Sequence, residues 1–118
     1  MRSLRFILAA VLAASCPSCV RVLVDGEVPS PDGRHVATTF RTDPGAMNDY
    51  TSIVALRRTH EAFSRTAGEV FATRGSYPIA VRWISGTELT IACPECDPGR
   101  IEVRREQWGD VRIRYATR

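Results

Sequence analysis

The feature that most constrains the fold is a series of short segments in which apolar and polar residues alternate. The alternation is clearest at residues 100–104 and 111–115, where charged side chains occupy every second position. Because successive strand residues point to opposite faces of a sheet, such segments form amphipathic strands with one solvated face. Further strands are expected at residues 20–24, 35–41, 52–57, 69–73, 79–84 and 88–92.

Turn residues separate these segments and set the expected architecture. Pro, Gly, Asp and Ser cluster at residues 31–33, 43–45, 85–86, 97–99 and 109–110. This spacing predicts an all-β or β-rich fold, an antiparallel meander of six to eight strands arranged as a sandwich or a curled sheet. A chain of 118 residues is long enough for one such domain, which we place at residues 20–118.

Two middle segments depart from simple alternation. Residues 52–57 are apolar on both faces, which predicts a central strand covered on each side or pressed against a helix. At most one short helix is expected, near residues 59–67, because Thr59 can cap it and Glu61 favours a first turn. Gly68 would end it.

The first fifteen residues have the pattern of a secretory signal peptide, residues 1–15. A basic head with Arg2 and Arg5 precedes nine apolar residues and then small residues at the cleavage position. A membrane-spanning helix needs roughly 20 apolar residues, so this run is too short to be one. The sequence therefore predicts export.

Cys16 follows the small residues directly, and residues 12–16 resemble the lipobox of bacterial lipoproteins. The resemblance implies that the Cys16 thiol receives a diacylglycerol and becomes the mature N-terminus, with residues 16–19 as anchor and tether. Ala13 stands where the usual pattern has Leu. The alternative is ordinary cleavage after Ser15, which releases a soluble secreted domain. The expected location is the cell envelope, facing the periplasm or the outside.

The charge balance argues against a nucleic-acid partner. All sixteen basic residues are Arg, and removal of residues 1–15 leaves fourteen Arg against thirteen Asp and Glu. The two signs are interspersed, whereas nucleic-acid binders cluster basic residues without matching acids. The expected partners are therefore the membrane, through the lipid anchor, and another envelope protein.

Cys93 and Cys96 form a C-x-x-C pair, the pattern in this chain that most suggests a reactive or metal-binding site. Its spacing repeats that of Cys16 and Cys19. Four thiolates can form a zinc site, but 73 residues separate Cys19 from Cys93, far more than such sites usually have. A redox dithiol needs a helix behind its first Cys, and the sequence gives no sign of one after residue 96. The favoured interpretation is a disulfide, or a pair of unreactive thiols, at a hairpin tip in an oxidising compartment.

A few further residues are candidates for binding. Trp108 lies in a turn where a large aromatic side chain has little core to enter, so it is a candidate contact for a partner or the membrane surface. His35 and His60 are interpreted as surface residues, because neither belongs to a metal-spaced cluster. One loop combines residues that could bind a cation or another polar ligand, or form only a solvated turn: Asp43, Asn48, Asp49 and Tyr50.

Residues 30–92 also resemble a group of small exported bacterial proteins and lipoproteins of unknown function. The resemblance lies in residues 30–37, 40–46, 50–56, 68–71 and 81–83. This chain has Pro44 where the group has a loop Cys, and Glu69 where it has Asn. The resemblance implies an exported β-rich domain and no particular activity.

No catalytic motif, such as a Gly-x-Ser-x-Gly elbow, occurs in the chain, and no cofactor or metal is expected. Two function hypotheses follow. The first is a non-enzymatic, lipid-anchored domain that binds another envelope component. The second is a small thiol or metal protein that acts through Cys93 and Cys96.

Overall fold

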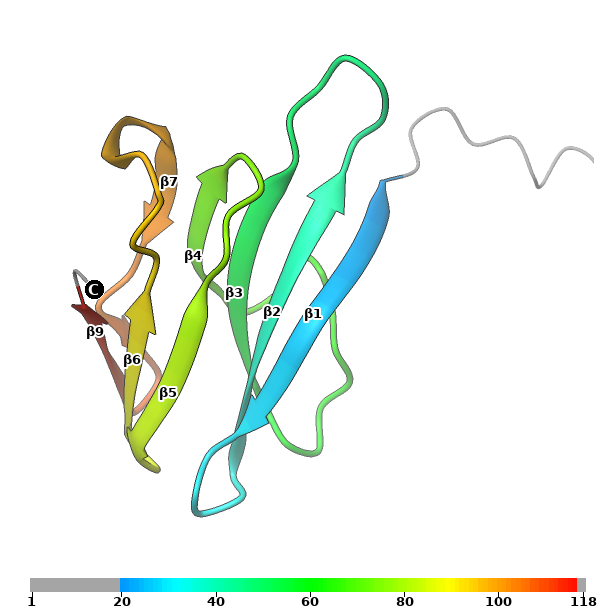
Figure 1. The fold of residues 1–118 in the computed structure, drawn as a ribbon. Coiled ribbons are helices and arrows are strands. Elements are labelled where there is room, and N and C mark those ends of the chain that lie inside the picture. The colour runs from blue at the N-terminus through cyan, green and yellow to red at the C-terminus, as the bar shows by residue number, and fades with distance from the viewer. Residues whose placement is uncertain (1–19, 117–118) are drawn as a thin grey trace, which may run out of the picture.

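The computed structural model describes residues 20–116, which form a sandwich of two β-sheets (Figure 1). The proposed signal peptide, the tether and Cys16 lie outside the described residues. One sheet has five strands in the order β1 (Arg21–Pro29), β2 (His35–Asp43), β3 (Thr51–Arg58), β4 (Glu69–Arg74) and β7 (Ile101–Arg104). The other has four, in the order β5 (Ala80–Ser85), β6 (Glu88–Ala92), β9 (Val111–Ala116) and β8 (Gln107–Trp108).

The β-rich sandwich confirms the predicted fold class, with two differences in detail. The described part of the chain has nine strands instead of six to eight, because β8 is a separate two-residue strand. Strands β6 and β9 pair in parallel, so the sheet that contains them is mixed. Between them the chain crosses to the five-stranded sheet as β7 and returns, which supplies the long connection that parallel strands require.

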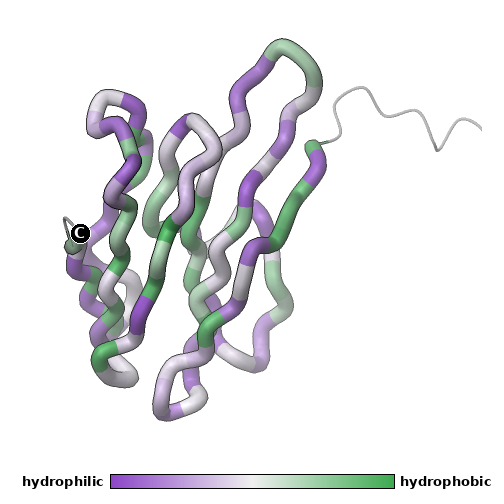
Figure 2. The backbone as a smooth tube through the Cα atoms, viewed as in Figure 1, coloured by the Kyte–Doolittle hydropathy of each residue, from purple (hydrophilic) through white to green (hydrophobic). Residues whose placement is uncertain are grey.

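The apolar side chains form two clusters, one on each face of the five-stranded sheet. Figure 2 shows hydrophobic residues along the strands of both sheets, with hydrophilic residues between them. The larger cluster fills the space between the sheets and includes Ala37, Val54, Leu56, Val70, Phe71, Leu89, Ile91, Val111 and Ile113. The smaller one covers the outer face of the five-stranded sheet and consists of Phe40, Ile53, Ala55 and Ala72.

Strand β3 is buried on both faces, as the sequence predicted for residues 52–57. Its outer face is covered by a loop at residues 59–67, where the structure has turns and no helix. A local contact holds these turns, because Arg57 Nη1 donates to the carbonyl oxygens of Thr59 and Glu61 at 3.3 and 2.7 Å. The ring of Phe63 then packs edge-on against Phe40, with 5.1 Å between centroids.

Gly68 joins this loop to β4 at a place where only glycine fits. Its φ of 78° lies in the left-handed region, and its carbonyl oxygen accepts a hydrogen bond from the Leu56 amide at 2.8 Å. A Cβ at this position would overlap the carbonyl oxygen of Leu56. The close approach of Gly68 to β3 therefore fixes the start of β4.

Within residues 20–116, no helix is long and apolar enough to cross a bilayer.

Candidate functional site

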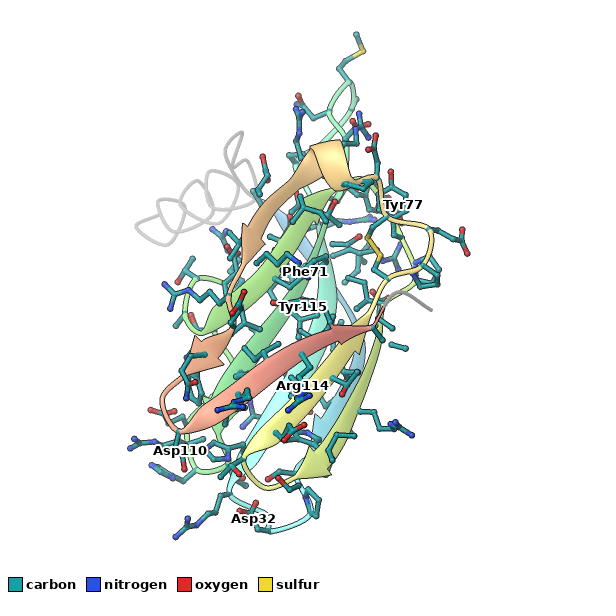
Figure 3. All side chains as sticks on the ribbon, turned by 90° about the vertical axis from the view of Figure 1, so that its left-hand side faces the viewer. Asp32, Phe71, Tyr77, Asp110, Arg114 and Tyr115 are labelled. Carbon is teal, nitrogen blue, oxygen red and sulfur yellow. A yellow bond between two sulfur atoms is a disulfide. The ribbon has the colours of Figure 1, made fainter. Side chains whose placement is uncertain are left out.

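A cleft of about 920 Å³ opens at one end of the sandwich. The start of β2, the residues that follow β3, and the turn between β8 and β9 form its walls. Figure 3 shows Asp110 of that turn at the same end of the molecule as Asp32, which precedes β2. The charged and aromatic residues that line the cleft are Arg34, His35, Arg58, His60, Glu61, Trp108 and Asp110.

His35 forms the inner wall of the cleft and is only 6% exposed. Its ring stacks on Trp83 with 6.0 Å between centroids and meets Trp108 edge-on at 5.9 Å. The His35 Nε2 atom lies 3.5 Å from Asp110 Oδ1, whereas its buried Nδ1 has no hydrogen-bond partner within the described chain. Buried polar atoms are rarely left unpaired, so this nitrogen is one of a few exceptions among the described residues.

The prediction that His35 is a surface residue is therefore wrong. The alternation of β2 places His35 on the same face as Ala37, which belongs to the cluster between the sheets. His60 is exposed, as expected, and borders the same cleft.

A network of hydrogen bonds in the turn at residues 30–34 holds His35 in place. The Ser30 hydroxyl accepts a bond from the His35 amide at 3.0 Å and donates to Asp32 Oδ1 at 2.6 Å. The bond from Ser30 and a second one from the Arg34 amide lower the pKa of Asp32 below its usual value. Because the Asp32 carboxylate stays ionised, it accepts these two hydrogen bonds throughout the neutral pH range.

Thr59 ties this turn to the end of β3. Its amide donates to the Arg34 carbonyl oxygen at 2.9 Å, and its hydroxyl donates to the carbonyl oxygen of Gly33 at 2.6 Å. Strand pairing also places Arg58 opposite His35. Two arginines, Arg34 and Arg58, are thereby held on neighbouring segments at the mouth of the cleft.

The charged groups of the cleft are unequally paired. Glu61 Oε1 accepts a hydrogen bond from the Arg58 amide at 2.9 Å, and Asp110 faces His35. The guanidinium groups of Arg34 and Arg58 form no ion pair with any carboxylate of residues 20–116. One oxygen of Glu61 thus has a protein donor, while the guanidinium groups, the strongest hydrogen-bond donors of the cleft, have no carboxylate partner among residues 20–116.

Trp108 borders the cleft as well, but it does not project freely from its turn. It is half-buried and packs against the cluster between the sheets, because its pairing with Val111 directs it inward. The argument that Trp108 finds little core to enter is therefore wrong. Its contact with a partner stays a prediction, now through the part of the ring that lines the cleft.

The predicted polar loop lies at the opposite end of the sandwich, where β2 ends and β3 begins. Asp43 Oδ1 accepts a bond from the Gly45 amide, and Asp43 Oδ2 lies 3.4 Å from Arg21 Nη2. Asp49 Oδ2 is paired with Arg100 at 3.1 Å, and the guanidinium of Arg41 lies 5.7 Å from the ring centroid of Tyr50. Within residues 20–116, the Asn48 side chain adds no hydrogen bond to this set. The loop residues are thus linked to arginines around them and do not converge on one ligand position.

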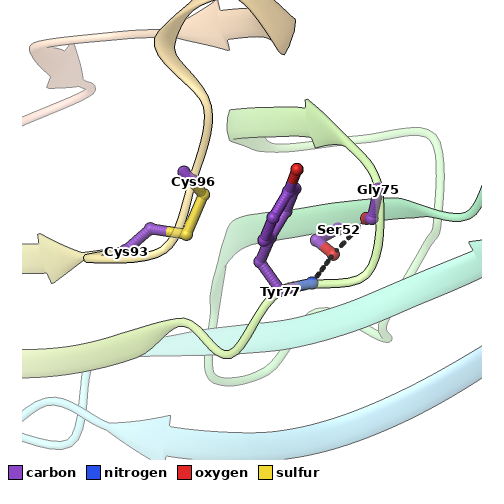
Figure 4. Close-up of a disulfide and its surroundings, with 5 residues drawn as sticks. All are labelled: Ser52, Gly75, Tyr77, Cys93 and Cys96. Carbon is purple, nitrogen blue, oxygen red and sulfur yellow. Dashed lines mark hydrogen bonds between the residues drawn. A yellow bond between two sulfur atoms is a disulfide. The ribbon is translucent and has the colours of Figure 1, made fainter.

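Cys93 and Cys96 form a disulfide in the structure, with 5.4 Å between their Cα atoms. Both are half-buried against the cluster between the sheets, and Figure 4 shows the disulfide facing the ring of Tyr77. Ser52 fixes that segment, because its hydroxyl donates to the carbonyl oxygen of Gly75 and accepts from the Tyr77 amide. The disulfide thus closes the tight turn that directly follows β6.

The backbone after the disulfide differs from that of a redox centre. The Cys93–Cys96 turn leads into η2 (Pro98–Arg100), a 3₁₀ turn of three residues capped by Asp97. A low thiolate pKa in C-x-x-C enzymes depends on an α-helix N-terminus at the first Cys, which this turn does not supply. Within residues 20–116 there is also no group of three or more His, Cys, Asp or Glu side chains placed to hold a metal.

We expect the Cys93→Ser, Cys96→Ser double variant to fold and to melt only a few degrees lower. A disulfide that closes so short a loop restricts the unfolded chain little, so its contribution lies at the low end of about 0–5 kcal/mol. Thermal unfolding followed by circular dichroism measures the difference. Failure of the variant to fold would show that this pair is essential, contrary to a structural role of modest size.

Another hollow of about 340 Å³ lies beside the disulfide. Tyr115 fills part of it, with its hydroxyl donating to the Arg105 carbonyl oxygen and its ring 4.1 Å below the Arg104 guanidinium. Burial raises the pKa of Tyr115 to about 12. The polar groups here are already bonded to each other, so this hollow offers less for recognition than the cleft at His35.

Comparison with known protein families, curated proteins and solved structures finds no match for this chain. Arguments about function therefore rest on the sequence pattern and on the geometry of the cleft.

Proposed function

We propose that this protein is an exported, lipid-anchored domain of the bacterial cell envelope that binds another envelope component in the cleft at His35 and carries out no catalysis. The observation that carries the binding function is the cleft itself. A buried histidine between two tryptophans forms its inner wall, beside two arginines that have no carboxylate partner among residues 20–116. Clefts that combine an apolar wall with a few converging polar groups are the usual form of binding sites.

Three sequence features support export and anchoring. Residues 1–16 combine a basic head, an apolar run, small residues and a cysteine in the order typical of exported lipoproteins. The Cys93–Cys96 disulfide suits an oxidising compartment. The resemblance of residues 30–92 to small exported bacterial proteins agrees with both.

The topology supports this arrangement, because an anchor at Cys16 would leave the cleft facing away from the membrane. The four residues between Cys16 and Arg21 span at most about 14 Å, so the start of β1 would stay near the bilayer. Strand β1 then runs for nine residues, or roughly 30 Å, toward the end of the sandwich where β2 begins at His35. A partner in the envelope would thus reach the cleft without hindrance from the membrane.

Cys16→Ser is expected to move the protein from the membrane fraction to the soluble envelope fraction, or to leave it unprocessed. Its matched control is Cys19→Ser, which removes a thiol three residues later and is expected to stay in the membrane. Intact-mass measurement of both fractions detects the diacylglycerol. Equal partition of the wild type and the Cys16 variant would refute the anchor.

Binding in the cleft is tested by a photoreactive phenylalanine analogue placed at His60, which borders the cleft and is exposed. Irradiation of intact cells is expected to join the protein to one envelope component. The control position is Ile84, which is 50% exposed on β5 and does not line the cleft. Equal cross-linking from both positions, or none from position 60, would contradict binding at the cleft.

A further inference from the structure

We propose that the cleft binds a small organic anion, whose carboxylate or phosphate group is held by Arg34 and Arg58 while its apolar part lies against Trp108. This inference rests on the proposed binding function and names the chemistry of the ligand. It uses residues that come together only in the folded chain.

Arg34 and Arg58 both line the cleft and come from adjacent segments of the chain. Arg58 pairs with His35 across β2 and β3, and Arg34 is the residue directly before His35. The bond from Thr59 to the Arg34 carbonyl oxygen keeps the two segments together. A guanidinium group presents a planar fork of donors that matches the two oxygens of a carboxylate or phosphate, so two such forks at one mouth favour an oxyanion.

The formal charges of Arg34, Arg58, Glu61 and Asp110 sum to zero, so the preference for an anion depends on which groups have partners. One oxygen of Glu61 already accepts the Arg58 amide, and Asp110 faces His35 Nε2. The guanidinium groups form no ion pair among the described residues, so the hydrogen bonds that the cleft lacks are bonds to acceptors. A ligand with acceptor oxygens supplies them.

The remaining wall and the size of the cleft fit a small molecule with an apolar part. Trp108 is half-buried and contributes an aromatic surface beside His35. The volume of about 920 Å³ lies within the range of small-molecule sites, roughly 300–1,000 Å³. A ring or short chain attached to the anionic group would cover Trp108 and exclude water from the arginines.

Intrinsic fluorescence gives a direct test. The chain has two tryptophans, and both rings contact His35, so the whole tryptophan signal arises next to the cleft. Benzoate and phenyl phosphate are expected to change the emission of the purified domain saturably, whereas benzyl alcohol at the same concentrations is not. Acetate and inorganic phosphate show how much of the effect needs the ring, and the comparison of the two anion types shows which oxyanion the arginines prefer.

Arg34→Gln and Arg58→Gln are each expected to weaken binding of the best anionic probe about tenfold, because each loses a charge-assisted contact. The matched control is Arg82→Gln, which removes an exposed arginine of β5 that lies outside the cleft and is expected to bind normally. Circular dichroism of all three variants verifies that they are folded.

Equal binding of benzyl alcohol and benzoate would overturn the anion preference but leave the cleft as a binding site. Equal weakening by Arg82→Gln would show a nonspecific charge effect and would also overturn the inference. The absence of any response to the anionic probes would do the same, while cross-linking from position 60 would still report separately on the proposed binding function.

Discussion

Gly68→Ala is expected to lower the free energy of unfolding by roughly 3 kcal/mol or more, one of the larger effects that a single substitution produces. Two costs add at this position. The φ of 78° is unfavourable for alanine, and the new Cβ would overlap the carbonyl oxygen of Leu56 in the neighbouring strand. Because that oxygen belongs to the backbone of β3, it cannot turn aside as a side chain would. Urea unfolding of the purified domain measures the loss.

Gly33→Ala is the matched control, because this substitution has the cost of a positive φ without the overlap of the new Cβ. The φ of Gly33 is 74°, and a Cβ there meets no atom within 4 Å. Its loss is expected to be about 1–2 kcal/mol, the conformational cost alone. Equal losses for the two variants would show that the strand accommodates the added methyl group at residue 68.

Leu89→Ala is expected to cost about 2–5 kcal/mol, the range for removal of a large side chain from a packed core. Leu89 is fully buried between the sheets, and strand pairing places it between Trp83 of β5 and Ile113 of β9. The substitution would leave a cavity on which both sheets border, so the whole sandwich would lose stability in a single transition. The midpoint of urea unfolding falls while the slope stays constant.

Ile84→Ala tests whether this cost comes from burial. Ile84 lies in the same hairpin as Leu89 but is 50% exposed, so its truncation is expected to cost less than about 1 kcal/mol. A large loss for Ile84→Ala would mean that its face of the sheet is covered in solution. A small loss of unfolding free energy for Leu89→Ala would mean that the two sheets move together and fill the cavity.

The amphipathic strands were the most predictable part of the fold. Residues 111–115 were expected as a strand, and β9 spans Val111–Ala116. Strand β1 is longer than the expected segment 20–24, because it continues through Asp25 and Gly26 with an irregularity in register between Val24 and Gly26. Arg41 of the neighbouring strand binds both oxygens of Asp25 at 3.0 and 2.9 Å, a contact that local turn preferences cannot reveal.

The faces of β2 show why the core was harder to predict. Val36 and Phe40 look like the core face, and they are buried, but they lie on the outer face of the sheet beneath the loop at 59–67. The face with His35 and Ala37 points between the sheets. Both faces of the strand are covered, so alternation alone gives no basis for choosing the inner one.

The candidate site was predictable only in its parts. His35 and Trp108 were each singled out from the sequence, but 73 positions separate them and their contact depends on which way β8 faces. The expected binding loop at Asp43–Tyr50 was identified by residue type, whereas its carboxylates are paired with arginines from β1 and η2. The sequence shows which charged and aromatic side chains are present. Contacts between segments that are distant in sequence decide which of these side chains remain without a partner.

The return of the chain from β7 to β9 has a consequence for how this protein acquires its structure. Strands β1 to β4 follow one another in one sheet, and β5 and β6 form a hairpin in the other, so both can form from neighbouring segments. The chain passes from one sheet to the other after β4 and again after β6, and residues 98–116 then place β7 at the edge of the first sheet and β9 beside β6 in the second. Folding therefore requires contacts between parts of the chain that are distant in sequence. Domains with such topologies fold in milliseconds to seconds, at the slow end for domains of this size.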